Sequence, residues 1–275
     1  MRVSLIQMNS VSDRAKNLAD AKALMQRAIE SDRPDLLVLP EHFDWSGGTT
    51  ADKLAAADRV PGGEAYGMAQ EMARRHEVWV HAGSMLERIE SEGRIYNTSV
   101  VFDRTGREIA RYRKIHMFDI TGPDGTVYQE SATVRPGRDI VLYDLEGLRV
   151  GCAICYDLRF AELFVALARR GAEVIVLPAS FTLQTGKDHW EALCRARAIE
   201  TQCYLLACAQ WGSFPGPDGR PRQTYGHSLV ADPWGHVIAK ASDGVGPLSA
   251  TVDPAQIRRV RGLIPMNEHR RLPAA

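Results

Sequence analysis

The stretch VGCAICYDLRFAEL, residues 150–163, places two cysteines three positions apart and follows the second with an aspartate and an arginine. A redox pair of this spacing normally sits at the start of a helix with its two sulfurs in bonding distance. Here Leu148–Ile154 has the apolar pattern of a strand, so the two side chains start toward opposite faces. The other three cysteines lack the spacing of zinc ligands. The sequence therefore favours neither a redox centre nor a metal site.

Cys155 is the candidate nucleophile among the five cysteines. A buried structural role is the commonest fate of a free cysteine, and it suits Cys152, Cys203 and Cys208, which lie in apolar runs. Cys155 instead stands where the strand gives way to a helix, held by the sheet yet at its rim. Because a thiol with a pKa of about 8.5 is mostly protonated at neutral pH, it needs a base or a positive neighbour.

Two other segments offer such partners. Glu41 follows a buried strand and a proline in VLPEHF, and Lys114 ends a strand in ARYRKIHMFD. Taken singly, the glutamate also fits a structural cap and the lysine a solvated charge. A cysteine–histidine pair is a further possibility, but His116 and His227 are interpreted as hydrogen-bonded structural residues. Asp157 is interpreted as a turn or ion-pair residue.

The elements that must position these residues alternate between short apolar strands and helical patterns. Helices are indicated over Leu18–Ile29 and Phe160–Leu167, and Asp188 with Glu191 resembles a capping box that opens a third. This pattern predicts an α/β fold with mixed strand pairing, forming one domain over residues 1–275. The expected strands are Val3–Gln7, Leu36–Leu39, Val78–Ala82, Asn97–Phe102, Glu108–Tyr112, Leu148–Ile154, Val174–Leu177, Tyr204–Ala209, Ser228–Ala231, Val237–Ala241 and Leu248–Val252.

One repeated sequence pattern, referred to below as the echoing segments, concerns the site. LVLPEHF (residues 37–43) and IVLPASF (residues 175–181) each read as a buried strand that leaves the sheet at a proline. Both strands would deliver their next residues to a sheet rim, where α/β proteins usually bind ligands. Phe43 and Phe181 are thus candidates for walls of a pocket, although core packing explains an aromatic equally well. GSFPGPDGRP, residues 212–221, reads as a long surface loop.

The overall charge excludes several classes of partner. Lysine plus arginine and aspartate plus glutamate number 34 each, so no global field favours nucleic acid or an anionic membrane. No apolar run approaches the roughly 20 residues of a membrane span. The N-terminal apolar run is too short for a secretory leader. Widely spread cysteines in apolar surroundings fit a reducing compartment, so the sequence predicts a cytoplasmic protein.

Together the segments VSLIQMN, LPEHF, YRKIHMFD, CYDLRFAEL and YGHSLVADPWG, in this order, resemble the nitrilase superfamily of carbon–nitrogen hydrolases. The resemblance implies a four-layer αββα sandwich that forms a homodimer or a higher homo-oligomer. It also implies a catalytic triad in which Glu41 is the general base, Lys114 the electrostatic stabiliser and Cys155 the nucleophile. Glu130 matches a supporting glutamate of the family. No metal and no organic cofactor is required.

Such a triad hydrolyses an amide through a covalent intermediate. Glu41 takes the proton of Cys155, and the thiolate attacks the amide carbonyl. Lys114 and a backbone N–H, assigned to Tyr156, stabilise the charge that grows on the carbonyl oxygen. Ammonia departs, and water then releases the acid from the thioester. The partner is accordingly a small-molecule amide.

The family branch most similar to this chain contains deaminated glutathione amidase, with the ω-amidases of α-ketoglutaramate and α-ketosuccinamate close behind. Both kinds of substrate carry carboxylates, so a cation is expected in the pocket. Arg159 is the first candidate, Arg195 and Arg197 are others, and a local salt bridge explains each equally well. A nitrilase acting on nitriles and a catalytically inactive binding protein with this fold are the alternatives.

Overall fold

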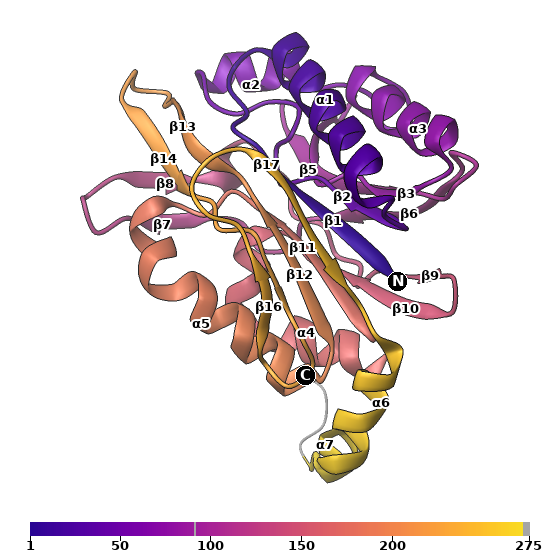
Figure 1. The fold of residues 1–275 in the computed structure, drawn as a ribbon. Coiled ribbons are helices and arrows are strands. Elements are labelled where there is room, and N and C mark those ends of the chain that lie inside the picture. The colour runs from indigo at the N-terminus through magenta and orange to yellow at the C-terminus, as the bar shows by residue number, and fades with distance from the viewer. Residues whose placement is uncertain (91, 272–275) are drawn as a thin grey trace.

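The computed structural model describes residues 1–90 and 92–271, and in it two large sheets face each other (Figure 1). The first sheet runs in the order β17-β1-β2-β3-β5-β4, with β6 paired to β5. Its strands are β1 Arg2–Gln7, β2 Leu36–Val38, β3 Trp79–His81, β4 Met85–Arg88, β5 Ile95–Phe102, β6 Glu108–Arg113 and β17 Gly246–Thr251. The second sheet runs in the order β16-β15-β12-β11-β10-β9. Its strands are β9 Leu142–Leu145, β10 Leu148–Cys152, β11 Val174–Ala179, β12 Tyr204–Ala209, β15 Leu229–Ala231 and β16 Val237–Lys240.

Helices cover the outer sides of both sheets (Figure 1). The pair α1 and α3 packs on the first sheet, while α4 and α5 cover the second. This arrangement is the four-layer αββα sandwich expected above. The helices are α1 Arg14–Asp32, α2 Thr50–Ala56, α3 Glu64–His76, α4 Ala161–Arg169, α5 Leu183–Thr201, α6 Pro254–Leu263 and α7 Met266–His269, with short 3₁₀ turns η1 Glu130–Ala132 and η2 Cys155–Arg159. Among the described residues, no helix has the length and apolarity needed to cross a bilayer.

The core lies between the two sheets. Val3, Leu5 and Val38 of the first sheet belong to the same buried cluster as Val150 and Leu205 of the second, and all five are fully or almost fully buried. Strands buried on both faces read as continuous apolar runs rather than alternating ones. That is why the sequence pattern located these strands so readily.

The two echoing segments occupy equivalent places in the two sheets. β1, β2 and β3 are parallel neighbours, and so are β10, β11 and β12. β2 and β11 are thus the middle strands of two parallel triplets, and both end at the same rim. The expectation that proline marks the strand exit is correct for Pro40. It is wrong for Pro178, which stays in register with Cys208 while the strand continues to Ala179.

Two hairpins replace loops that the sequence reading did not resolve. Residues 212–221 form most of a hairpin of β13 (Trp211–Pro215) and β14 (Pro221–Tyr225), so the surface-loop prediction is wrong. A second hairpin joins β7 (Asp119–Thr121) to β8 (Val127–Gln129). Both turn on the same tetrapeptide, Gly-Pro-Asp-Gly, whose last N–H bonds to the carbonyl of the first glycine. Turns of this composition reverse the chain tightly, so the repeated tetrapeptide in the sequence indicated two hairpins.

The third helix begins earlier than predicted. α5 starts at Leu183, so Asp188 and Glu191 lie inside it and form no capping box at its start. Gly186 lies in the first turn of α5, and a Cβ there would come within 2.3 Å of the Tyr225 side chain on β14. Only a glycine lets the start of α5 approach β14 this closely, although glycine has a poor intrinsic helix propensity. This contact depends on the tertiary structure and leaves little trace in the local pattern.

Candidate active site

Cys155 lies at the junction between β10 and the short turn η2. Its backbone has φ +46°, in the left-handed region that residues with a side chain rarely adopt. Such a conformation costs about 1–3 kcal/mol and persists only where the surrounding structure fixes it. The side chain is buried yet lines a cavity. The strand thus ends in a constrained turn that presents the thiol to the cavity.

Asp157 fixes that turn from inside the protein. Its fully buried carboxylate accepts hydrogen bonds from Tyr112 Oη at 2.6 Å and from the Ile154 amide at 2.8 Å. It also accepts the amide of His116 at 3.1 Å and pairs with His116 Nδ1 at 2.7 Å. The interpretations of Asp157 as a turn and ion-pair residue and of His116 as a hydrogen-bonded structural histidine are therefore confirmed. Three of these hydrogen bonds tie the turn that carries Cys155 to the end of β6 and the residues just after it, and the fourth closes the turn on itself.

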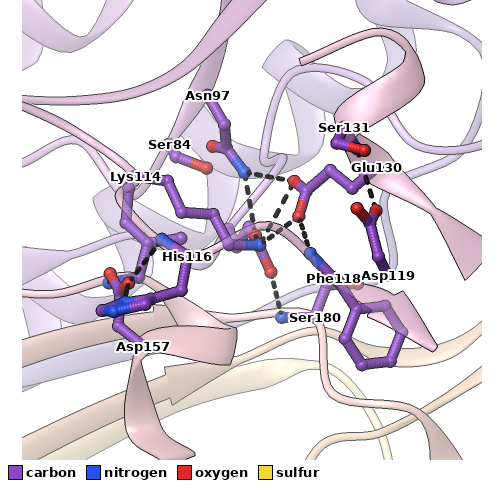
Figure 2. Close-up of polar contacts among 12 residues, drawn as sticks. Ser84, Asn97, Lys114, His116, Phe118, Asp119, Glu130, Ser131, Asp157 and Ser180 are labelled. Atoms are coloured by element: carbon purple, nitrogen blue, oxygen red, sulfur yellow. Dashed lines mark hydrogen bonds and ion pairs between the residues drawn. The ribbon is translucent and has the colours of Figure 1, made fainter. Parts of the chain in front are cut away.

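Lys114 stands between two glutamates. Its ammonium nitrogen lies 3.0 Å from Glu41 Oε1 and 2.9 Å from Glu130 Oε2. Lys114 and Glu41 are buried, and the side chain of Glu130, which reaches Lys114 in Figure 2, is 9% exposed. Glu130 follows the β7–β8 hairpin, and the amide of Phe118 donates to its Oε2 at 2.7 Å. Charge-assisted bonds of this kind are short and strong. Glu41, Lys114 and Glu130, which are far apart in the sequence, therefore form one ionic cluster.

Two further groups that the sequence reading missed hold Glu41. Asn97 Nδ2, on β5, donates to Glu41 Oε1 at 2.9 Å and to Glu130 Oε1 at 3.5 Å (Figure 2). The amide of Ser180, directly after β11, donates to Glu41 Oε2 at 2.8 Å. The echoing strands β2 and β11 thus meet at this carboxylate. A buried asparagine in the apolar strand IYNTSVVF was an available signal, since buried polar groups need partners.

The charges of this cluster are coupled. Burial raises the pKa of Glu41, but the attraction of Lys114 prevails and the pKa falls from 4.5 to about 2. For Lys114, burial lowers the pKa and the two carboxylates raise it well above its usual value. Burial and the Glu41 charge raise the pKa of the Cys155 thiol well above its usual value, while Lys114 opposes them. At neutral pH the glutamate is thus ionised and the thiol is protonated, and the charge of Glu41 acts directly on the thiol.

The carboxylates of Glu41 and Glu130 and the ring of His42 place ligand atoms within 4.8 Å of one another, which is metal-ligand geometry. The ammonium of Lys114, however, donates to both carboxylates and already supplies the positive charge between them. Burial lowers the pKa of His42 to about 4, so its ring is neutral and adds no charge. The two carboxylates are therefore satisfied by the protein's own lysine, which occupies the place of a resident metal ion.

A cavity of about 470 Å³ opens over this cluster. Six of the predicted site residues line it, namely Glu41, Lys114, Glu130, Cys155, Tyr156 and Phe181. The cavity also contains two cations that the sequence reading missed, Lys53 on α2 and Arg222 on β14. Aromatic side chains form much of its remaining wall: Trp45, Phe118, Tyr128 and Phe214. Its size is within the range of pockets that take small-molecule ligands.

Phe43 and Arg159 are absent from that lining. The side chain of Phe43 is instead completely buried in the core, so the expectation that it walls the pocket is wrong. Two positions beyond Glu41, its side chain packs among the residues beneath α1 and α3. Arg159 packs its guanidinium against Phe181, 5.2 Å from the ring centroid, and contacts His189 Nδ1 at 3.3 Å. It thus stands behind the cavity wall.

The other arginines named above are structural. Arg195 donates to the carbonyl of Gly235 at 2.8 Å. Arg197 donates to the carbonyl of Leu158 at 2.8 Å and pairs with Glu200 at 2.9 Å. The local salt bridge is therefore confirmed for Arg197, whereas Arg195 forms a backbone hydrogen bond to a distant segment and no salt bridge that the described residues show. His227 bonds through Nδ1 to the Tyr225 carbonyl at 2.8 Å, which confirms its interpretation as a hydrogen-bonded structural residue.

Comparison with known proteins identifies the family. Residues 2–262 match the family model described as carbon-nitrogen hydrolase. The chain belongs to the carbon–nitrogen hydrolase family. It is accordingly a hydrolase of carbon–nitrogen bonds in amides, as the resemblance of its motifs implied.

The similarity to its relatives spans nearly the whole of this chain. A protein from Synechocystis named deaminated glutathione amidase is 39% identical over 268 residues, which cover 96% of each chain. The human protein of the same name is 37% identical over 98% of this chain and 82% of its own length. The crystal structure of Saccharomyces cerevisiae Nit3, a member of branch 10 of the nitrilase superfamily, has a TM-score of 0.86 at 30% identity. That match covers 99% of this chain and 97% of the yeast chain.

Proposed function

We propose that this protein is a cysteine-dependent amidase whose substrate is deaminated glutathione, the compound in the names of its relatives. The observation that carries the chemistry is that Glu41, hydrogen-bonded to Lys114, lines the same cavity as the Cys155 thiol and interacts with it electrostatically. The relatives' names support the substrate. In this scheme Cys155 is the nucleophile, Glu41 the general base, Lys114 the electrostatic stabiliser and Glu130 a positioning residue.

The first half of the reaction forms a thioester. Because the Cys155 thiol is protonated at rest and Glu41 is ionised, the proton moves to Glu41 only as sulfur bonds to the amide carbon. The tetrahedral intermediate carries its negative charge on the former carbonyl oxygen. Protonated Glu41 then gives its proton to the nitrogen, the carbon–nitrogen bond breaks, and a neutral amine leaves.

Two donors are assigned to the developing oxyanion. Lys114 supplies a fixed positive charge, held in place by Glu130, Glu41 and the surrounding low-dielectric interior. The amide of Tyr156 lies in the first turn of η2, where N–H groups have no partner within the helix. Loss of one such donor typically lowers the rate about 10²- to 10³-fold.

Water completes the cycle. A water molecule takes the place of the departed amine, Glu41 removes its proton, and the hydroxide attacks the thioester carbon. Collapse of this second intermediate breaks the carbon–sulfur bond, and sulfur recovers the proton from Glu41. The products are an acid and an amine, and the enzyme returns to its starting charge state.

The identity of the leaving group follows from the substrate. Deaminated glutathione joins its 2-oxo acid to a cysteinylglycine unit through the scissile amide. Its hydrolysis therefore releases a dipeptide amine, and the ammonia expected from the motifs alone applies to the ω-amidase alternative. The aromatic, 470 Å³ cavity favours the larger leaving group.

The test is a side-by-side assay of the purified protein on deaminated glutathione and α-ketoglutaramate, with Cys155→Ala as the inactive control. Both substrates give the same 2-oxo acid, so one product assay measures both. A higher kcat/KM for deaminated glutathione supports the proposal. A higher value for α-ketoglutaramate assigns the protein to the ω-amidases instead. Turnover of neither compound, or of simple nitriles only, contradicts the proposed substrate class.

Three expectations from the sequence remain proposals. We propose one domain over residues 1–275, a homodimer and a cytoplasmic location. Two independent observations support a single domain: one buried cluster spans both sheets, and both sheets contribute to the active-site cavity. Sedimentation equilibrium of the purified chain tests the homodimer.

A further inference from the structure

Positive charge in the cavity falls into two groups. The lysine and arginine side chains of the described residues that line it are Lys53, Lys114 and Arg222. Lys114 belongs to the catalytic cluster, because its ammonium lies 3.0 Å from Glu41 and 2.9 Å from Glu130. Lys53 and Arg222 take no part in that cluster's hydrogen bonds. They are therefore the cations available to an anionic ligand.

Lys53 stands close to the reaction centre. It belongs to the short helix α2, which a capping box between Thr49 and Asp52 anchors at its start. Within residues 1–90 and 92–271, its ammonium has no hydrogen bond and no ion pair. Burial lowers the pKa of Lys53, and the charge of Glu130 raises it. The ammonium thus lies within electrostatic reach of the catalytic cluster, yet its hydrogen bonds remain free.

Arg222 lies among the hairpins that border the cavity. Its guanidinium packs over the ring of Tyr128, 5.1 Å from the centroid, and so connects β14 to β8. One nitrogen, Nη2, lies 3.3 Å from Asp218, whose side chain is half exposed. Across the described chain, Nε and Nη1 of Arg222 make no hydrogen bond. With its side chain only 13% exposed, the guanidinium is held in place with two donors unused.

The proposed substrate has two carboxylates, one on each side of the scissile amide. The 2-oxo acid carboxylate lies fewer bonds from the reacting carbon than the glycine carboxylate does. Of the two free cations, Lys53 is the one that interacts electrostatically with the Glu130–Lys114 cluster. Arg222 interacts with the hairpin residues Asp218 and Tyr128 instead. Lys53, which interacts with the Glu130–Lys114 cluster, is therefore matched to the carboxylate nearer the reacting carbon, and Arg222, on the hairpin, to the more distant one.

We infer that Lys53 binds the carboxylate of the acyl half of the substrate and that Arg222 binds the carboxylate of the leaving amine. This assignment rests on the amidase function proposed above. It makes Arg222 the residue that selects amides of carboxylate-bearing amines over primary amides. A guanidinium suits this role because its planar donors match a carboxylate.

Two substrates with the same acyl half separate these roles. Deaminated glutathione carries both carboxylates, whereas α-ketoglutaramate carries only the acyl one and releases ammonia. Arg222→Met should lower kcat/KM about 10- to 100-fold for deaminated glutathione, the effect of one lost hydrogen bond to a charged group. In this variant the ratio of kcat/KM for deaminated glutathione to kcat/KM for α-ketoglutaramate should fall by a similar factor. Lys53→Met should lower both values about 10- to 100-fold and leave their ratio within about threefold.

Matched controls remove charge from the same regions outside the cavity. Arg220 lies on the same hairpin as Arg222, and Arg59 lies just beyond α2; both side chains are exposed, and each is replaced by methionine. Each should leave both kcat/KM values within about twofold of wild type. Arg222→Lys keeps the charge and should restore part of the lost selectivity. Circular dichroism checks that all variants fold.

The assignment is overturned if Arg222→Met leaves the ratio of the two kcat/KM values unchanged, whether both values fall equally or neither falls. So does Arg159→Ala if that variant alone raises KM for both substrates, because Arg159 would then be the carboxylate ligand. These results arise in an active enzyme and leave the amidase chemistry standing. A wild-type protein that hydrolyses neither substrate overturns the proposed function and this assignment together.

Discussion

Replacing Lys114 with methionine should reverse the pH dependence of the protein's stability. The ammonium now lies between Glu41 and Glu130, and without it two buried carboxylates face each other with ligand atoms within 4.8 Å. At an effective dielectric constant of about 20, two unit charges at 4.8 Å repel by about 3.5 kcal/mol. That energy corresponds to roughly a few hundredfold in proton affinity. Burial acts in the same direction, so the pair must bind a proton.

The sign of the effect follows from the pKa in the folded and unfolded chain. In the wild type the pKa of Glu41 falls from 4.5 to about 2 on folding. Its ionised form thus contributes about 3 kcal/mol above pH 4.5, and this stability is lost as the pH falls toward 2. In Lys114→Met the upper pKa of the pair lies above 4.5 instead. The variant is then most stable below pH 4.5 and loses stability as the pH rises through that raised pKa.

Urea unfolding followed by circular dichroism at about pH 5, 6, 7 and 8 measures the effect. We expect Lys114→Met to be about 3–5 kcal/mol less stable than wild type near pH 8, because it leaves an uncompensated buried charge. The deficit should shrink by about 2 kcal/mol or more toward pH 5. Adding Glu130→Gln removes the repulsion and should flatten the profile. A single variant that is as insensitive to pH as wild type over this range refutes the reasoning.

Three further variants test other parts of the site. Cys155→Ala should abolish turnover while the melting temperature stays within a few degrees of wild type; residual turnover contradicts the nucleophile assignment. Tyr112→Phe leaves Asp157 without one of its four hydrogen bonds, and should lower the free energy of unfolding by about 1–3 kcal/mol in urea titrations; no change would mean that the bond contributes nothing. Phe43→Ala should cost about 3–5 kcal/mol of stability through its core cavity, with KM nearly unchanged, and a raised KM at full stability would return Phe43 to the pocket.

The sequence by itself determined the candidate reacting groups. Glu41 and Cys155 each follow a buried, apolar strand, and such strands are recognisable locally because burial on both faces leaves a continuous apolar run. Parallel strands end at one rim of a sheet, so strand-end positions already imply that these side chains point into a shared region. The order of the family-like motifs added Lys114 and Glu130, and all four residues do line one cavity.

Only the tertiary structure decided how the site is held and what it faces. The bond from the Ser180 amide to Glu41 joins residues 139 positions apart, and no local pattern encodes that distance. Phe43 turns into the core because packing, not its place after a strand, sets its direction. Lys53 and Arg222 come from segments without any motif, and they reach the cavity only because α2 and the β13–β14 hairpin fold over it. The charged lining of the cavity therefore depends on contacts between distant elements, which a linear reading of the chain does not contain.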